Sequence, residues 1–219
     1  MRDRNAPLSA DDIEALDWGK MDGLLPVVVQ DRVSGRVLML GYMDPSALRA
    51  TFDSGLVTFF SRSKQRLWQK GESSGNRLRM RAIFADCDND SLLVIADPDG
   101  PTCHTGTLSC FGDQALEGAG WLGHLSAIVR KRAASGDAKS YTRKLIADGP
   151  ERIAQKVGEE GVEVALAAVT RDAEGCAEET ADLLYHLAVL MEAKGFGWAE
   201  VVDLLKARHS AASSSIAAS

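Results

Sequence analysis

The chain has 219 residues, which is enough for one large domain or two modest ones. Its 45% hydrophobic and 26% charged residues are typical of a folded globular protein and give no support to disorder, collagen or coiled coil. A net charge of −6 argues against broad binding to nucleic acids or to anionic membranes. Small molecules are therefore the expected partners.

The first twenty residues and the cysteines predict where the protein works. The N-terminus lacks the apolar stretch of a signal peptide, and the longest uncharged apolar run, residues 183–191, is far below the ~20 residues that span a bilayer. Four unevenly spaced cysteines do not suit a disulfide-stapled secreted module. We expect a cytoplasmic protein with reduced thiols.

Strand-length apolar segments dominate the first half of the chain. One of them alternates basic and apolar residues, which places Leu78, Met80 and Ala82 on one buried face. Residues 44–55 are typical of a short helix, with an Asp-Pro start and a Gly stop. The five predicted strands cover residues 24–31, 36–43, 56–63, 77–83 and 91–97.

The second half shows only helical periodicity. Apolar stripes predict helices that begin at residue 121 and that cover 140–147, 151–170 and 178–193. We therefore predict a multidomain protein in which a mainly-β (α+β) domain is followed by an all-α bundle. Its parts are the β-rich domain at 1–112, a Gly-rich linker at 113–120, the helical bundle at 121–209 and a flexible tail at 210–219.

Three of the four cysteines, Cys87, Cys103 and Cys110, lie within 24 residues. Free cysteines are often small core residues, but these lie in the polar stretches DCDND and HTGTLS, which favours metal binding. Three thiolates suit Zn²⁺ and leave a position for a water that could ionise near neutral pH. A redox switch without enzyme function is the alternative.

Three aspartates, Asp86, Asp88 and Asp90, surround Cys87. In an extended segment their carboxylates would project opposite Cys87 and could hold a hard ion such as Mg²⁺. A plain acidic hairpin turn is the common alternative. An EF-hand is excluded because its sixth position would be Ser91 instead of glycine.

The stretch 61–76 combines basic, hydroxyl and glycine residues with one tryptophan. Such groups cradle phosphates, and Trp68 could stack on a base or anchor the loop. A solvated loop is equally consistent with the pattern.

These motifs, FFSRSKQRLWQKGESSGN, DCDND and GPTCHTGTLSCF in that order, resemble phosphoribosyl-AMP cyclohydrolase of histidine biosynthesis over nearly all of residues 24–111. The resemblance implies zinc on the three cysteines and magnesium on the three aspartates. It also implies a homodimer whose subunits share the zinc site. That family opens the adenine ring of phosphoribosyl-AMP by adding water at carbon 6, for which a zinc-activated water is a sensible nucleophile.

His104, beside a metal cysteine, is then the candidate proton shuttle or an additional metal ligand, although a structural role is equally compatible with its position. The candidate substrate-binding residues in this half are Ser61, Arg62, Trp68, Lys70, Glu72, Ser74, Gly75 and Asn76.

Acidic residues recur at helical spacing in the second half. Glu159 and Glu163 are four apart, and Glu179 and Asp182 are three apart, so each set can converge on one helical face. A solvated acidic stripe is the common alternative. Because leucines flank Asp182, we expect its carboxylate to be buried and to need a cation or hydrogen-bond partners.

The motifs SYTRKLIADG, KVGEEGVEVALAA and EETADLLYHL resemble phosphoribosyl-ATP pyrophosphatase, a relative of the all-α MazG-type pyrophosphohydrolases, over about residues 121–208. The family cleaves between the α and β phosphates. Glu160 or Glu163 is the candidate base, and Lys144 and Lys156 are candidates for phosphate binding. The implied magnesium ligands are Glu159, Glu160, Glu163, Glu179 and Asp182.

Together the two resemblances predict a bifunctional enzyme of histidine synthesis. Its C-terminal domain would act first, on phosphoribosyl-ATP, and its N-terminal domain would then open the ring of phosphoribosyl-AMP. A rival interpretation is a general nucleotide pyrophosphohydrolase with a regulatory zinc module.

Overall fold

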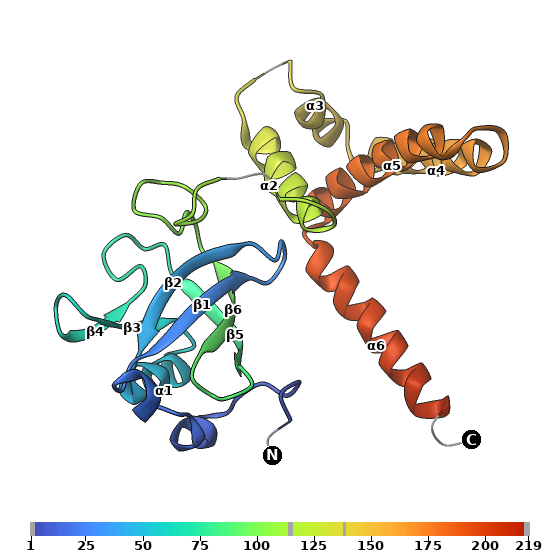
Figure 1. Cartoon of the computed structure of the whole chain (residues 1–219). Helices are drawn as coiled ribbons and strands as arrows, with labels where there is room; N and C mark the ends of the chain where they lie inside the picture. The colour runs from blue at the N-terminus through green and yellow to red at the C-terminus, as the bar shows by residue number, and fades with distance from the viewer. Residues whose placement is uncertain (1–2, 114–115, 138, 217–219) are drawn as a thin grey trace. The chain divides into compact units, whose positions relative to one another are not determined.

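The protein divides into two compact units, one up to Gly120 and one from Trp121 onward (Figure 1). The computed structural model describes residues 3–113, 116–137 and 139–216. The first unit is rich in strands and the second is helical, which confirms the predicted fold class. The predicted linker, 113–120, includes residues 114 and 115, which lie outside the described residues.

The main sheet of the N-terminal unit has the strand order β2-β1-β6-β5. Strand β1 pairs antiparallel with β2 and parallel with β6, and β6 pairs antiparallel with β5. In both central strands alternate side chains are buried, because one face of the sheet covers the core. The strands are β1 (Leu25–Asp31), β2 (Val37–Met43), β5 (Leu78–Ala85) and β6 (Leu92–Pro98).

A two-stranded antiparallel hairpin, β3 (Thr58–Ser61) and β4 (Arg66–Gln69), follows helix α1 (Pro45–Ser54). The helix begins as predicted, because the Asp44 carboxylate accepts a hydrogen bond from the backbone N–H of Ala47 at 2.7 Å. Strand β4 was not predicted, since its four residues lie in a polar stretch.

The buried face of β5 differs from the prediction. Leu78 is buried and Met80 half-buried, but a register shift between Met80 and Ala82 exchanges the two faces. Beyond it Ile83 and Ala85 are the buried residues. The predicted alternation therefore holds only for the first half of the strand.

Two 3-10 helices, η1 (Ala10–Ala15) and η2 (Gly19–Met21), precede the sheet and were not predicted. Ile13 and Leu16 from this region join the core of the N-terminal unit. The segment is thus part of the folded unit.

The C-terminal unit contains five helices within the described residues. Its core combines Leu125, Val129, Leu145, Ile153 and Val189, and α4 packs along α5 (Figure 1). The helices are α2 (Gly120–Ala134), α3 (Tyr141–Ala147), α4 (Pro150–Thr170), α5 (Ala173–Lys194) and α6 (Trp198–Ile216).

Two helix limits differ from the sequence prediction. Helix α5 begins five residues earlier than expected, because the Asp172 side chain caps it by accepting from the N–H of Gly175 at 3.0 Å. Helix α6 was not predicted and extends to Ile216, within the segment expected as a tail, whose residues 217–219 lie outside the described residues. No helix in the described part of the chain is long and apolar enough to cross a membrane.

Candidate active sites

The three aspartates of the N-terminal unit lie on the turn between β5 and β6. The prediction of an extended segment is wrong here, because Asn89 adopts a left-handed conformation with φ of 61° and the chain reverses. Nevertheless one carboxylate oxygen from each of Asp86, Asp88 and Asp90 lies within 4.8 Å of the others. The turn itself makes the acids converge.

Asp86 is fixed by the turn that it supports. Its carboxylate accepts hydrogen bonds from the backbone N–H of Asp90 at 3.0 Å and from the hydroxyl of Ser91 at 2.6 Å. Burial opposes ionisation, but these hydrogen bonds prevail and lower the pKa of Asp86. Asp86 is therefore held as a carboxylate.

A lysine that the sequence analysis did not single out completes this cluster. The ammonium group of Lys20, on η2, forms ion pairs with Asp88 and with Asp90, the latter at 2.5 Å. Hydrogen bonds to Asp88 and Asp90 raise the pKa of Lys20. No local pattern around Lys20 indicates this contact, because its partners are far away in sequence.

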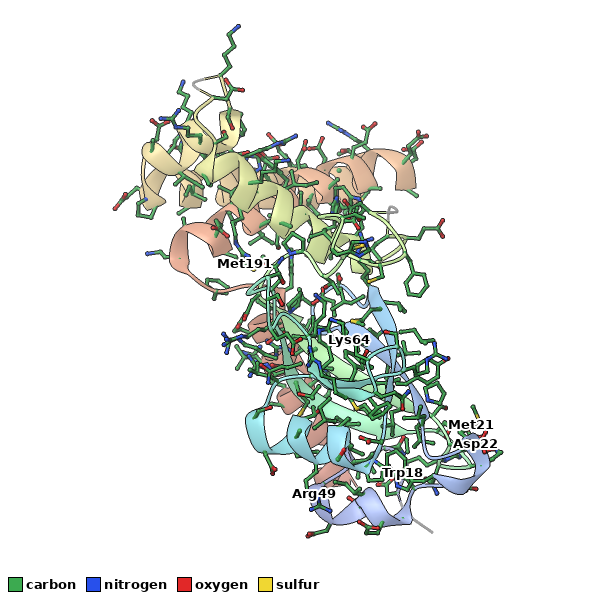
Figure 2. All side chains as sticks on the ribbon, turned by 90° about the vertical axis from the view of Figure 1, so that its left-hand side faces the viewer. Trp18, Met21, Asp22, Arg49, Lys64 and Met191 are labelled. Carbon is green, nitrogen blue, oxygen red and sulfur yellow. The ribbon has the colours of Figure 1, made fainter. Side chains whose placement is uncertain are left out.

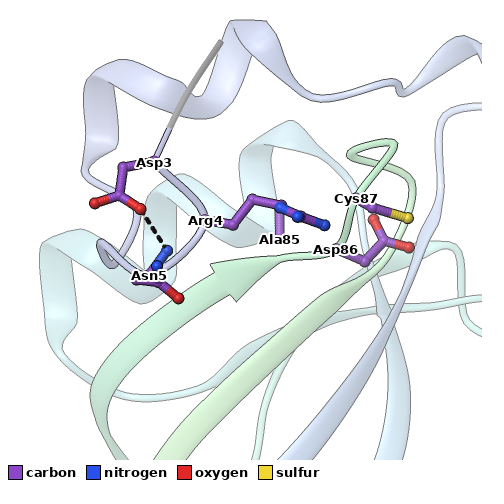
Figure 3. A pocket seen from close by; sticks show the side chains of 6 residues that line it. All are labelled: Asp3, Arg4, Asn5, Ala85, Asp86 and Cys87. Atoms are coloured by element: carbon purple, nitrogen blue, oxygen red, sulfur yellow. Dashed lines mark hydrogen bonds between the residues drawn. The ribbon is translucent and has the colours of Figure 1, made fainter.

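An open pocket of about 530 Å³ lies beside the acidic turn (Figure 3). Arg4 extends from the N-terminal segment toward Asp86 across this pocket, so a cationic side chain faces a candidate metal ligand. The pocket is lined by Asp3, Arg4, Asn5, Ala85, Asp86 and Cys87.

Cys103 and Cys110 lie together in the segment after β6. The hydroxyl of Thr105 donates to the Cys103 sulfur at 3.0 Å and lowers the pKa of that thiol to about 6. Burial, followed by the neighbouring Cys103, raises the pKa of Cys110. His104 is exposed, with its Nδ1 3.9 Å from the Cys103 sulfur.

Cys87 stands apart from this pair. Among the residues that the structure describes, the groups of three or more ligands within 4.8 Å of one another are both acidic, and neither contains a cysteine. One chain therefore brings two of its candidate zinc ligands together, while exposed Cys87 lies on the acidic turn.

The basic stretch 61–76 forms the β3–β4 hairpin and the turn that follows, and is not simply a loop. The Trp68 ring stacks on Phe59 at a centroid distance of 5.8 Å, so it anchors the hairpin to the core. Arg62 lies 3.9 Å above the Tyr42 ring. Glu72 binds Arg66 at 2.6 Å, so these two exposed charges already satisfy each other.

The turn after β4 contains the remaining candidate substrate residues. Lys70 is buried, and burial lowers its pKa against the attraction of nearby Cys110 and Cys103. Lys70 thus lies beside the thiols in a buried position, and not in an open position where its ammonium group could bind a phosphate from solvent. Ser74, Gly75 and Asn76 lie in the turn itself, with Gly75 at a φ of 78°.

The C-terminal unit brings a second set of acids together. One oxygen from each of Glu160, Glu179 and Asp182 lies within 4.8 Å of the others, across α4 and α5. Glu163 is close enough that a hydrogen bond with Glu160, and then its charge, raise the pKa of Glu163. Glu159 lies outside this group of three, but it shares the ammonium group of Lys156 with Glu160, at 2.8 Å from its own carboxylate and 3.0 Å from that of Glu160.

The prediction that Asp182 is the buried acid of this cluster is wrong. Asp182 is exposed, because the leucines beside it in sequence point to other sides of α5. Glu160 is the buried carboxylate, with 5% of its surface accessible. Its charge is offset by Lys156 at 3.0 Å, which also binds Glu159, and hydrogen bonds to both glutamates raise the pKa of Lys156.

A buried histidine supports this acidic cluster. Nδ1 of His186 lies 2.9 Å from the carbonyl oxygen of Asp182, an acceptor, so this nitrogen carries the proton. The other nitrogen, Nε2, lies 3.1 Å from the Tyr141 hydroxyl, which then donates. His186 Nδ1 is also 3.5 Å from a carboxylate oxygen of Glu160. The candidate phosphate ligand Lys144, on α3, is exposed.

Comparisons with known families match each of the two units to a different family. Residues 39–112 match the phosphoribosyl-AMP cyclohydrolase family, and residues 122–209 match the phosphoribosyl-ATP pyrophosphohydrolase family. The chain is thus a two-part hydrolase, with one match in each unit.

Similar curated proteins join the same two parts. The histidine biosynthesis bifunctional protein HisIE of Escherichia coli K12 is 56% identical over 194 residues, 89% of this chain and 95% of the relative. The protein of the same name from Vibrio cholerae is 52% identical over 198 residues, 90% and 94% of the two chains. The chain therefore belongs to the family of bifunctional histidine-biosynthesis enzymes, as predicted.

Proposed function

We propose that the C-terminal unit hydrolyses phosphoribosyl-ATP to phosphoribosyl-AMP and pyrophosphate, and that the N-terminal unit then opens the adenine ring of phosphoribosyl-AMP. The observation that carries this proposal is the separation of the sites. Each unit has its own cluster of three acids, and each cluster lies within its own family match. Small nucleotides in the cytoplasm, and not nucleic acids or membranes, are the proposed substrates.

In the N-terminal unit we assign zinc to Cys87, Cys103 and Cys110, and magnesium to the three aspartates. The fit is chemical: the lowered pKa of Cys103 supplies a thiolate at neutral pH, and carboxylate oxygens are the ligands that Mg²⁺ prefers. When bound, zinc would supply an activated water for addition to the ring. Exposed His104, beside Cys103, would carry protons between this site and solvent.

The β3–β4 hairpin and the turn after β4 would bind the substrate. Ser61, Arg62, Ser74, Gly75 and Asn76 offer hydroxyl, guanidinium, backbone and amide donors to phosphate and ribose oxygens. The other three candidates would act on the substrate less directly, because their side chains are already engaged or enclosed. Trp68 stacks on Phe59 and would hold the hairpin, while Glu72, paired with Arg66, and buried Lys70 would balance charge.

In the C-terminal unit we assign magnesium to Glu159, Glu160, Glu163, Glu179 and Asp182. When bound, the ions would neutralise the triphosphate and orient the attacking water. Either Glu160 or Glu163 would act as the base, and the hydrogen bond with Glu160 raises the pKa of Glu163, which suits a proton acceptor. Lys144 is exposed and would reach phosphate from solvent, whereas Lys156 would have to leave two glutamates to do so.

A homodimer is also part of this proposal. Its support is twofold: Cys87 stands apart from the other two cysteines, and α4 exposes an apolar stripe made of Val162, Leu166 and Val169. A second copy of the chain would cover that stripe. We expect sedimentation equilibrium to give twice the chain mass, and a monomer at micromolar concentration would contradict the proposal.

The test of the two-step activity is to supply phosphoribosyl-ATP to the full chain with zinc and magnesium. We expect pyrophosphate to appear first and the ring-opened nucleotide to follow in equal final amount. Persistent accumulation of phosphoribosyl-AMP would rule out the second step and favour a pyrophosphohydrolase with a regulatory zinc module.

A further inference from the structure

At the acidic turn of the N-terminal unit, the aspartates pair with a cationic side chain of the chain itself, that of Lys20. Lys20 forms ion pairs with Asp88 and Asp90, two of the three carboxylates that we assign to magnesium. The Lys20 side chain is 46% exposed, so it is not enclosed by the turn. The ammonium group thus stands where a metal ion would bind.

The backbone holds Lys20 against this turn. The N–H of Asp17 donates to the carbonyl of Asn89 at 2.9 Å, which joins the N-terminal segment to the turn directly. The Asp17 side chain accepts from the N–H of Lys20 at 3.2 Å. The Trp18 indole donates to the carbonyl of Ile13 at 2.8 Å, and its ring packs against the core of the N-terminal unit. The placement of Lys20 is therefore built into the fold.

An ammonium group and a divalent cation cannot share these oxygen atoms. Both need the same carboxylates, and like charges a few ångströms apart repel strongly. The released side chain remains tethered beside the metal. Magnesium sites commonly combine carboxylates with substrate phosphates, and lysine is a common phosphate ligand.

We propose that Lys20 is a movable cation of the cyclohydrolase site: it holds Asp88 and Asp90 until a divalent cation displaces it, and it then binds a phosphate of phosphoribosyl-AMP. The second step rests on the function proposed above for the N-terminal unit. A purely structural ion pair would stabilise the fold without affecting the affinity for metal or substrate.

The first test is a Mn²⁺ titration of the zinc-loaded full chain, followed by electron paramagnetic resonance of the free ion. Lys20→Met removes the competing charge and should tighten one Mn²⁺ site by about threefold or more. Adding Asp88→Asn should abolish that gain. Arg49→Met is the matched control, because Arg49 is an exposed cation of α1 that pairs with Glu14 and lies apart from Met21 and Asp22, which follow Lys20 (Figure 2). An unchanged Mn²⁺ affinity in Lys20→Met would overturn the proposal.

The second test uses phosphoribosyl-AMP as the substrate. We expect Lys20→Met to raise KM by about tenfold with a smaller change in kcat, and Lys20→Arg to restore part of the loss. An unchanged KM would overturn phosphate binding by Lys20. If wild-type protein fails to open the ring, the proposed function fails, while the Mn²⁺ titration still decides whether Lys20 competes with metal.

Discussion

Cys103→Ser should abolish ring opening and leave pyrophosphate release nearly unchanged. The Thr105 hydroxyl lowers the pKa of Cys103 to about 6, so this thiol is largely ionised at neutral pH and is a strong zinc ligand. A serine hydroxyl stays neutral there. We expect a loss of about 100-fold or more in the cyclohydrolase rate and less zinc per chain, measured by separate assays and metal analysis.

The control for this change is Cys176→Ser. Cys176 lies on α5, outside both acidic clusters, and should retain both activities and the zinc. Loss of pyrophosphate release in Cys103→Ser would show that the two units do not function separately. Absence of zinc from wild-type protein purified under reducing conditions would instead favour the cysteines as a redox switch.

Glu160→Gln should impair pyrophosphate release and spare ring opening, which is the reverse of the effect expected for Cys103→Ser. The change keeps the shape of the side chain but removes the one buried carboxylate of the C-terminal cluster, on which Lys156 and Glu179 converge. We expect pyrophosphate release to fall by about 100-fold or more, because metal binding and charge balance both depend on this group. Ring opening of added phosphoribosyl-AMP should persist.

Glu178→Gln is the matched control for the second prediction. Glu178 precedes the candidate ligand Glu179 on α5, but it is exposed and outside the cluster. It should retain pyrophosphate release within about twofold. Equal losses in the two variants would mean that net charge, and not the site, determines the activity.

The sequence predicted the fold class because its periodic patterns are local. Alternation in the strands and apolar stripes in the helices depend on a few neighbouring residues, and so do the Asp44 cap and the helix stop at Gly55. Strand β4 and the register shift in β5 escaped prediction, since both depend on pairing with other strands.

The site residues were found by type and spacing, but their environments were not. Asp182 was expected to be buried and is exposed, while no burial was predicted for the candidate base Glu160, which is the buried acid. Burial of a helical residue is decided by the helices packed against it, which the sequence of one helix does not reveal. Lys20 escaped for the same reason, because its partners belong to a distant turn.

The parallel pairing of β1 with β6 has a consequence for biosynthesis of the chain. Val27 of β1 pairs with Leu92 of β6, so the two central strands of the sheet cannot pair until β6 has left the ribosome. Strand β2 can form a hairpin with β1 earlier, but one edge of β1 then waits unpaired. Cys103 and Cys110 follow β6 in the chain, whereas Cys87 and the three aspartates precede it, so the candidate metal ligands leave the ribosome both before and after the last strand of the sheet. The three candidate zinc ligands can therefore come together only when every strand of the main sheet is already available for pairing.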